Sequence, residues 1–115
     1  MLRSTFFLLG SLLVAPHACA HHGWSEYDTA TELRVTGVIK ESGYEHPHGH
    51  VRLEAAGKTW LVVLAPPSRM ENRGLPSADL KPGTTAAVVG FQNRSKPDEM
   101  RAERITINAK TTELR

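Results

Sequence analysis

The sequence has little of several features that define large classes of protein. It contains one cysteine among 115 residues, which excludes an internal disulfide framework and a cysteine-rich zinc cluster. Aromatic residues make up only 6% of the chain. The 14 Lys and Arg nearly balance the 12 Asp and Glu, which argues against a nucleic-acid binder with a strong basic patch. The length allows one small domain.

The one long apolar run lies near the start of the chain, at residues 6–15 (FFLLGSLLVA). It follows the basic residue Arg3 and precedes Pro16 and the small residues 18–20 (ACA). This order is typical of a secretory signal peptide, and the run is too short for a membrane anchor. We therefore expect a signal peptide at residues 1–20, a periplasmic or secreted protein, and a mature chain with no cysteine and no membrane span.

The remaining residues, 21–115, have mostly the pattern of β-strands. Segments that alternate or are rich in β-branched residues predict five strands, at residues 32–40, 50–54, 59–65, 84–91 and 100–107. Gly37 and Gly90 lie inside two of these segments, where glycine often marks a bulge or bend. Residues 69–73 predict a helical turn that ends at Gly74.

This pattern predicts an all-β fold class, with a single domain over residues 21–115. Five strands with a short helical insertion after strand 3 favour a small five-stranded OB-like Greek-key β-barrel. An immunoglobulin-like sandwich is the alternative, but it needs about seven strands. Either architecture leaves the function open.

Histidine is the residue type in excess, with six in the chain. Five follow the predicted cleavage site, in two groups: His21 and His22, then His46, His48 and His50. In an extended chain the second group, spaced by two, would point to one side. A turn at the intervening glycine would instead separate the last two.

A freed N-terminal His21 would offer two nitrogens, the α-amine and the ring, that both lose protons near neutral pH. One imidazole from elsewhere would complete the three-nitrogen copper site called a histidine brace. Such nitrogens bind Cu(II), Ni(II) and Zn(II), and copper most tightly. The mature chain has no thiolate, and Met70 and Met100 are far apart, which favours Cu(II) over Cu(I).

The predicted metal ligands therefore come from His21, His22, His46, His48 and His50, with copper expected and zinc or nickel as alternatives. Solvated surface histidines, or a pH switch, are the alternative interpretations of the same residues. No phosphate loop, nucleophile elbow or His-Glu-x-x-His motif occurs, so we do not expect an enzyme. An oxygen-activating enzyme with an open copper position is the alternative to that expectation.

Several of these segments together resemble one family. The segments His21-His22-Gly23-Trp24, Tyr27-Asp28, 35–39 (VTGVI) and Pro47-His48 are similar to the small exported bacterial proteins grouped as DUF6152. The likeness continues at Trp60, Pro66, Ser68, 73–75 (RGL) and 80–83 (LKPG). It implies an exported OB-like barrel with His21, His22 and His48 at family positions. His46 and His50 stand where the family usually has Asn and an aromatic residue, and the family name records no function.

We expect a periplasmic metal-binding protein that holds Cu(II) through the N-terminal and HPHGH histidines, for sequestration or delivery. Its expected partners are the metal ion and another envelope protein, and not nucleic acid. The alternative is a non-metal OB-type binding module that holds a peptide, glycan or partner protein through Trp24 and Tyr27. A purely structural envelope protein is a third interpretation. We expect Trp60 in the core and the charged residues 94–104 on a mixed surface.

Overall fold

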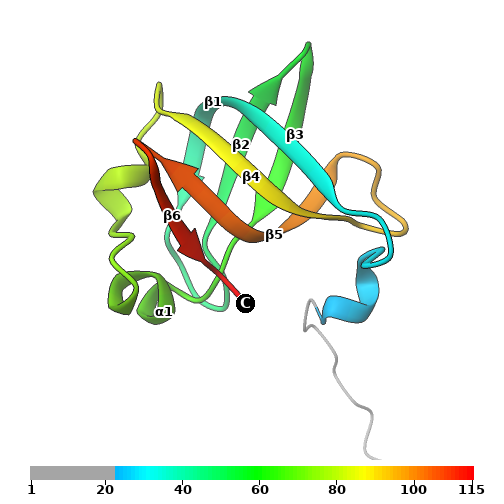
Figure 1. The fold of residues 1–115 in the computed structure, drawn as a ribbon, viewed down its shortest axis with the longest axis horizontal. Coiled ribbons are helices and arrows are strands. Elements are labelled where there is room, and N and C mark those ends of the chain that lie inside the picture. Colours follow the sequence, from blue (N-terminus) through cyan, green and yellow to red (C-terminus); the bar gives the residue numbers. More distant parts are fainter. Residues whose placement is uncertain (1–22) are drawn as a thin grey trace, which may run out of the picture.

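A computed structural model describes residues 23–115 of the chain (Figure 1). The predicted signal peptide and the predicted ligands His21 and His22 lie outside the described residues. The elements are η1 (Trp24–Glu26), β1 (Leu33–Gly43), β2 (His50–Ala55), β3 (Lys58–Val63), α1 (Pro67–Asn72), η2 (Ser77–Leu80), β4 (Thr85–Gln92), β5 (Glu99–Ile107) and β6 (Lys110–Glu113). No helix within residues 23–115 has the length and apolarity needed to cross a membrane.

Five strands close into a barrel. They follow the order β3-β2-β1-β4-β5, and β3 pairs with β5 in parallel through residues 61–63 and 99–101. The other pairs of the barrel are antiparallel. This is the strand order of an OB-type Greek-key barrel, with α1 after the third strand, so the expected fold class is confirmed.

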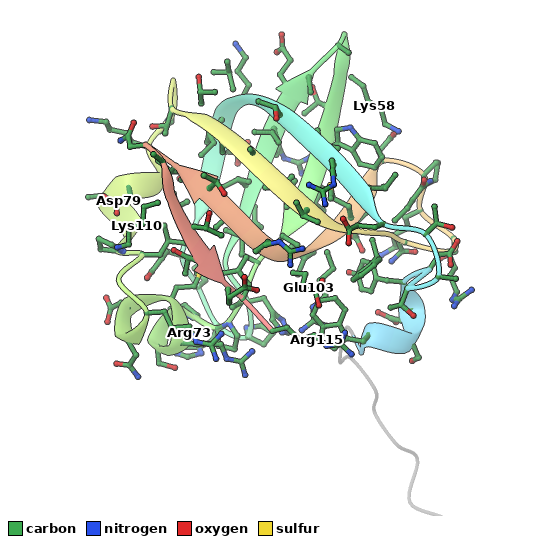
Figure 2. The ribbon with its side chains drawn as sticks, viewed as in Figure 1. Lys58, Arg73, Asp79, Glu103, Lys110 and Arg115 are labelled. Carbon is green, nitrogen blue, oxygen red and sulfur yellow. The ribbon has the colours of Figure 1, made fainter. Side chains whose placement is uncertain are left out.

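The sixth strand, β6, was not predicted from the sequence. Its residues KTTE carry no apolar alternation, and it forms an antiparallel hairpin with β5 at the edge of the sheet. Two arginines of the α1 segment donate hydrogen bonds to carbonyl oxygens at this edge: Arg73 to Glu113 at 2.7 Å, and Arg69 to Leu114 at 3.0 Å. Figure 2 shows Arg73 on this side of the molecule. These contacts occupy carbonyl oxygens at the end of the edge strand that would otherwise be open to another partner.

The two glycines inside the predicted strands have different roles. At Gly90 the register between β4 and β5 shifts, and a Cβ would lie 2.0 Å from the carbonyl oxygen of Arg101, so the predicted bulge is confirmed. At Gly37 a Cβ would lie 2.2 Å from the carbonyl oxygen of Glu54. The register shift of β1 falls later, between Ile39 and Glu41, so of the bulge or bend expected at Gly37 the bulge lies elsewhere. Gly37 marks a close approach of two backbones instead.

The barrel interior is apolar and contains side chains from every one of the five strands. Ile39, Leu53, Val62, Val88 and Met100 are at most 1% exposed. Burying an aliphatic side chain of this size contributes roughly 1.5–3 kcal/mol. Met70, Leu75 and Leu80, from α1 and the segment after it, belong to the same cluster.

Trp60 packs against this core, as expected, although its side chain is only partly buried. The ammonium of Lys58 lies 3.7 Å from the centre of its ring (Figure 2 labels Lys58). A lysine therefore covers the face of Trp60 that the core leaves open.

Candidate functional site

The outer face of β2, β3 and β5 carries two cross-strand rows of residues. The first row is His50, Val63 and Arg101, and the second is Arg52, Leu61 and Glu99. Directly opposed residues of paired strands point to the same side of the sheet. The topology therefore places Glu99 and Arg101 of β5 on the same face as His50 and Arg52 of β2, with β3 between the two strands.

His48 lies in the loop before β2, and its imidazole meets a buried arginine. The Nε2 atom of His48 is 3.4 Å from a terminal guanidinium nitrogen of Arg101. A guanidinium only donates hydrogen bonds, so Nε2 is the acceptor in this contact. Arg101 is only 7% exposed, and burial lowers its pKa from the ordinary value. It still carries a positive charge at neutral pH, directly beside the imidazole.

Trp24 joins the first described residues to the same arginine. The centre of its ring lies 4.3 Å from the Cζ atom of Arg101 and 4.6 Å from that of Arg115. Its edge contacts Tyr27 and Phe91, with ring centres 6.5 and 6.1 Å apart. Figure 2 shows Arg115 beside the η1 segment. Cation–π and aromatic contacts thus hold η1 against the outer face of the barrel.

A buried carboxylate lies next to this cluster. The Oε2 atom of Glu99 accepts hydrogen bonds from the Tyr27 hydroxyl and the Asn93 amide nitrogen, both at 2.8 Å, and Lys96 lies 4.0 Å from Oε1. Burial, first, and the hydrogen bond to Glu99, second, raise the pKa of Tyr27 well above its usual value. Tyr27 is completely buried. The expectation that it presents a binding face is therefore wrong, because its hydroxyl is bonded inside the protein.

Sequence reasoning also missed Glu99 and Arg101, which it placed on a mixed charged surface. Both are at most 7% exposed. The alternation with Met100 and Ala102 correctly identified the core side of β5. The alternation gave no sign that η1 and the pairing with β3 also cover the outer face of β5. The aromatic residues Trp24 and Tyr27, close to the start of the described residues, were the available signal that a cover exists.

The three histidines of the HPHGH segment do not gather on one face. His46 is exposed at a cis peptide bond with Pro47, and Gly49 exchanges backbone hydrogen bonds with Ala65 and Leu64 at 2.9 and 2.8 Å. In the described part of the chain, no group of three or more His, Cys, Asp or Glu side chains is arranged to hold a metal ion. The segment bends at His46 and Pro47 and not at Gly49, so the structure matches neither the arrangement with all three imidazoles on one side nor the turn at Gly49.

His48 and His50 nevertheless line one pocket, with a volume of about 410 Å³, on the outer face of β2 and β3. Its lining residues are Pro47, His48, Gly49, His50, Arg52, Leu61, Val63, Lys96 and Glu99. The volume falls within the range of roughly 300–1,000 Å³ that small-molecule sites occupy. The loop of His48 and the loop of Lys96 flank it. The pocket is thus the place where the HPHGH segment, the buried acid and two cations meet.

Comparison with known proteins identifies the family and the fold. Residues 10–100 match the family described as a family of unknown function, DUF6152. A comparison with the curated proteins gives no match. Among solved structures, the chain is similar to part of the crystal structure of a complex of TiaS with an isoleucine tRNA and ATP, with a TM-score of 0.52 and 18% identity. The match covers 76% of this chain and 19% of that chain, so this chain spans about a fifth of it. The likeness shows the fold alone.

Proposed function

We propose that this chain, which belongs to the DUF6152 family, is an exported protein that binds Cu(II) through histidine nitrogens for sequestration or delivery. The proposed ligands are the α-amine and ring of His21, after removal of residues 1–20, and the imidazole of His48. Zinc and nickel suit the same nitrogens but bind less tightly than copper.

The observation that carries this proposal is the series of contacts from Trp24 through Arg101 to His48. The tryptophan ring lies 4.3 Å from the Arg101 guanidinium carbon, and that guanidinium lies 3.4 Å from the His48 imidazole. His21 precedes Trp24 by three residues, and each residue adds at most about 3.6 Å of reach. The proposal requires a processed terminus starting at His21 to reach His48, and the contact of Trp24 with Arg101 begins this reach on the side of the barrel where His48 lies.

The described residues alone hold no three-ligand group, so a metal site here needs donor atoms from His21 or His22. An N-terminal histidine meets this need, because one residue supplies two nitrogens. His50 lines the same pocket as His48 and is the favoured fourth ligand. His46 is exposed and outside that pocket, so we assign it no ligand role in this proposal.

Arg101 sets a condition on metal binding. Its guanidinium contacts Nε2, which is the ring nitrogen that we propose as the ligand atom of His48. Copper binding at that atom therefore requires the guanidinium to move away, because the guanidinium and the metal ion are both positively charged and repel each other.

The test is a Cu(II) titration of the processed protein. The chain has two tryptophans, so Trp60→Phe leaves Trp24 as the single fluorophore beside the proposed site. We expect one Cu(II) per chain, quenching of Trp24, and nitrogen couplings in the electron paramagnetic resonance spectrum. His48→Ala, or one extra residue before His21, should each weaken binding at least tenfold. The exposed His46→Ala is the matched control and should leave the affinity unchanged. Equal copper binding by the extended chain would reject the N-terminal site.

A second candidate function is a binding module for a non-metal ligand in the cell envelope. The pocket of about 410 Å³ on the outer face of β2 and β3 favours it. Loops and strands at this position form the ligand face of many OB-type barrels. Because Tyr27 is buried, the ligand of such a module would occupy the pocket instead of contacting that residue.

A further inference from the structure

The residues that line the pocket beside His48 indicate the chemistry of a ligand that is not a metal ion. We propose that it binds a small organic carboxylate with an apolar body. This proposal gives the second candidate function its ligand class and rests on that candidate.

The apolar part of the argument comes from the third strand. Leu61 and Val63 point to the outer face of β3, where the neighbouring exposed residue Thr59 shows the polar character expected of a solvated face. Val63 is 7% exposed and Leu61 is partly buried. Together with Pro47 they give the pocket an apolar wall that the barrel core does not use. Such a wall favours a ligand with a hydrocarbon portion.

The charge of the lining favours an anionic group on that ligand. Arg52 and Lys96 contribute two cations, and Glu99 is the one acid among the residues that line the pocket. The Glu99 carboxylate already accepts two hydrogen bonds at 2.8 Å, from Tyr27 and Asn93. Its charge is therefore stabilised within the protein, and the balance of charge at the pocket is positive.

Arg52 has the geometry and freedom to hold a carboxylate. Its guanidinium lies 3.6 Å from Glu41, and the two side chains are 48% and 66% exposed. Exposed ion pairs of this kind contribute little, so exchange of Glu41 for a ligand costs little. A guanidinium can bind a carboxylate through two parallel hydrogen bonds, which an ammonium cannot do. Arg52 is thus the proposed anchor and Lys96 the supporting cation.

The residues that line the pocket argue against a nucleic acid, including a single strand, as the ligand. Among the described residues that line this pocket there is no Phe, Tyr or Trp, and its two imidazoles belong to His48 and His50. Proteins that bind single strands on a barrel face use aromatic side chains on which the bases stack. The pocket offers an aliphatic wall and a cationic anchor instead.

The test is a titration of EDTA-treated, metal-free protein with sodium hexanoate, followed by ¹H–¹⁵N NMR. We expect saturable shifts of the amides at residues 48–52, 61–63, 96, 98 and 99, with a Kd on the order of 1 mM for a ligand of this size. Acetate, which lacks the hydrocarbon chain, and 1-hexanol, which lacks the charge, should each bind at least tenfold more weakly.

Arg52→Gln is the informative variant, and we expect it to weaken hexanoate binding at least fivefold. Arg34→Gln is its matched control, because Arg34 is also an exposed arginine of a barrel strand paired with a neighbouring acid, at 2.8 Å from Glu32, and does not line the pocket. Arg34→Gln should leave the Kd unchanged. Equal losses in the two variants would overturn the proposal, because they would show attraction to net charge alone.

The outcomes distinguish failure of the carboxylate proposal from failure of the binding module on which it depends. Saturable shifts of the pocket amides by hexylamine or 1-hexanol, but not by hexanoate, would overturn the carboxylate and leave a binding module in place. An absence of shifts with every probe would overturn the carboxylate proposal and count against the module. Because the metal is removed before the titration, neither result depends on whether the protein binds copper.

Discussion

Gly43 and His50 stand opposite each other in the β1–β2 pair, and the imidazole of His50 covers the glycine. A Cβ atom at Gly43 would lie 2.2 Å from the ring Cε1 atom of His50 and 2.7 Å from its Nδ1 atom. The absence of a side chain on one strand therefore determines where a histidine ring of the next strand lies. Because His50 also lines the pocket, this contact shapes the site.

Gly43→Ala should move His50 without removing an imidazole. The atoms that the new Cβ would meet belong to the ring of a rotatable side chain, so the ring can turn away. We expect a change in the unfolding free energy of no more than about 1 kcal/mol, because alanine also restricts the unfolded chain. The ring proton resonances of His50 should shift, whereas those of His46 should not. Unchanged His50 resonances would contradict the contact.

Gly90→Ala is the matched opposite case. Its Cβ would lie 2.0 Å from the backbone carbonyl oxygen of Arg101 and 2.8 Å from the Cα of Ala102, and neither can rotate away. We expect a loss of about 3 kcal/mol or more in urea-induced unfolding, well beyond the effect of Gly43→Ala. Similar costs for the two alanine variants would show that the β4–β5 bulge tolerates a side chain.

Because of Tyr27, the free energy of unfolding should fall at alkaline pH. Burial and the bond to Glu99 raise the pKa of Tyr27 in the folded protein above the ordinary value of 10.0. The unfolded chain therefore loses this proton first, and the stabilisation, complete below about pH 10, falls as the pH rises further. Tyr27→Phe should cost about 2 kcal/mol at pH 7, as for a hydrogen bond to a charged group. The difference from the unsubstituted protein should shrink above pH 10 in urea unfolding.

Tyr44→Phe is the control for that experiment. The Tyr44 hydroxyl donates to the carbonyl oxygen of Leu75 at 2.6 Å, a neutral acceptor, so its loss should cost only about 1 kcal/mol. The chain has two tyrosines, so Tyr27 is then the single one left. Its tyrosinate absorbance should appear together with unfolding. Reversible ionisation of Tyr27 near pH 10 in the folded protein would contradict its burial.

Arg101→Gln should strengthen copper binding, provided that the variant is folded. The substitution removes a positive charge 3.4 Å from the Nε2 atom that the metal would use. We expect about tenfold higher Cu(II) affinity, measured by competition with a chelator, in a protein whose circular dichroism matches the parent. Weaker binding by a folded variant would show that Arg101 positions His48 for the metal. That result would contradict the proposed displacement of the guanidinium.

The strands were predictable because each carries its own alternation. All five barrel strands were found within a few residues of their observed bounds, and the helical segment after the third was found as well. β6 was missed because its residues Lys110–Glu113 have no apolar pattern, and its pairing depends on β5 and on the arginines of the α1 segment. At Gly37 the sequence could not distinguish a bulge or bend from a close approach of two backbones, because each of these favours glycine.

The site was less predictable than the barrel. The sequence singled out His48 and His50, which do share a pocket, but it contained no information on Arg101 contacting His48 across 53 positions. It also placed Glu99 with the solvated charges, whereas the hydroxyl of Tyr27 and the amide of Asn93 hold it in the interior. Each of these relationships joins residues from different elements.

The local sequence pattern by itself determined the number of barrel strands and their order along the chain. It also determined the helical turn after the third strand and the clustering of histidines in the sequence. These features depend on side-chain alternation and backbone preference over a few neighbouring residues. Only the tertiary structure decided which charges are buried, which histidines line one pocket and where that pocket opens. Those outcomes depend on barrel closure through the β3–β5 pair and on η1 covering β5, where the interaction free energy comes from groups distant in the chain.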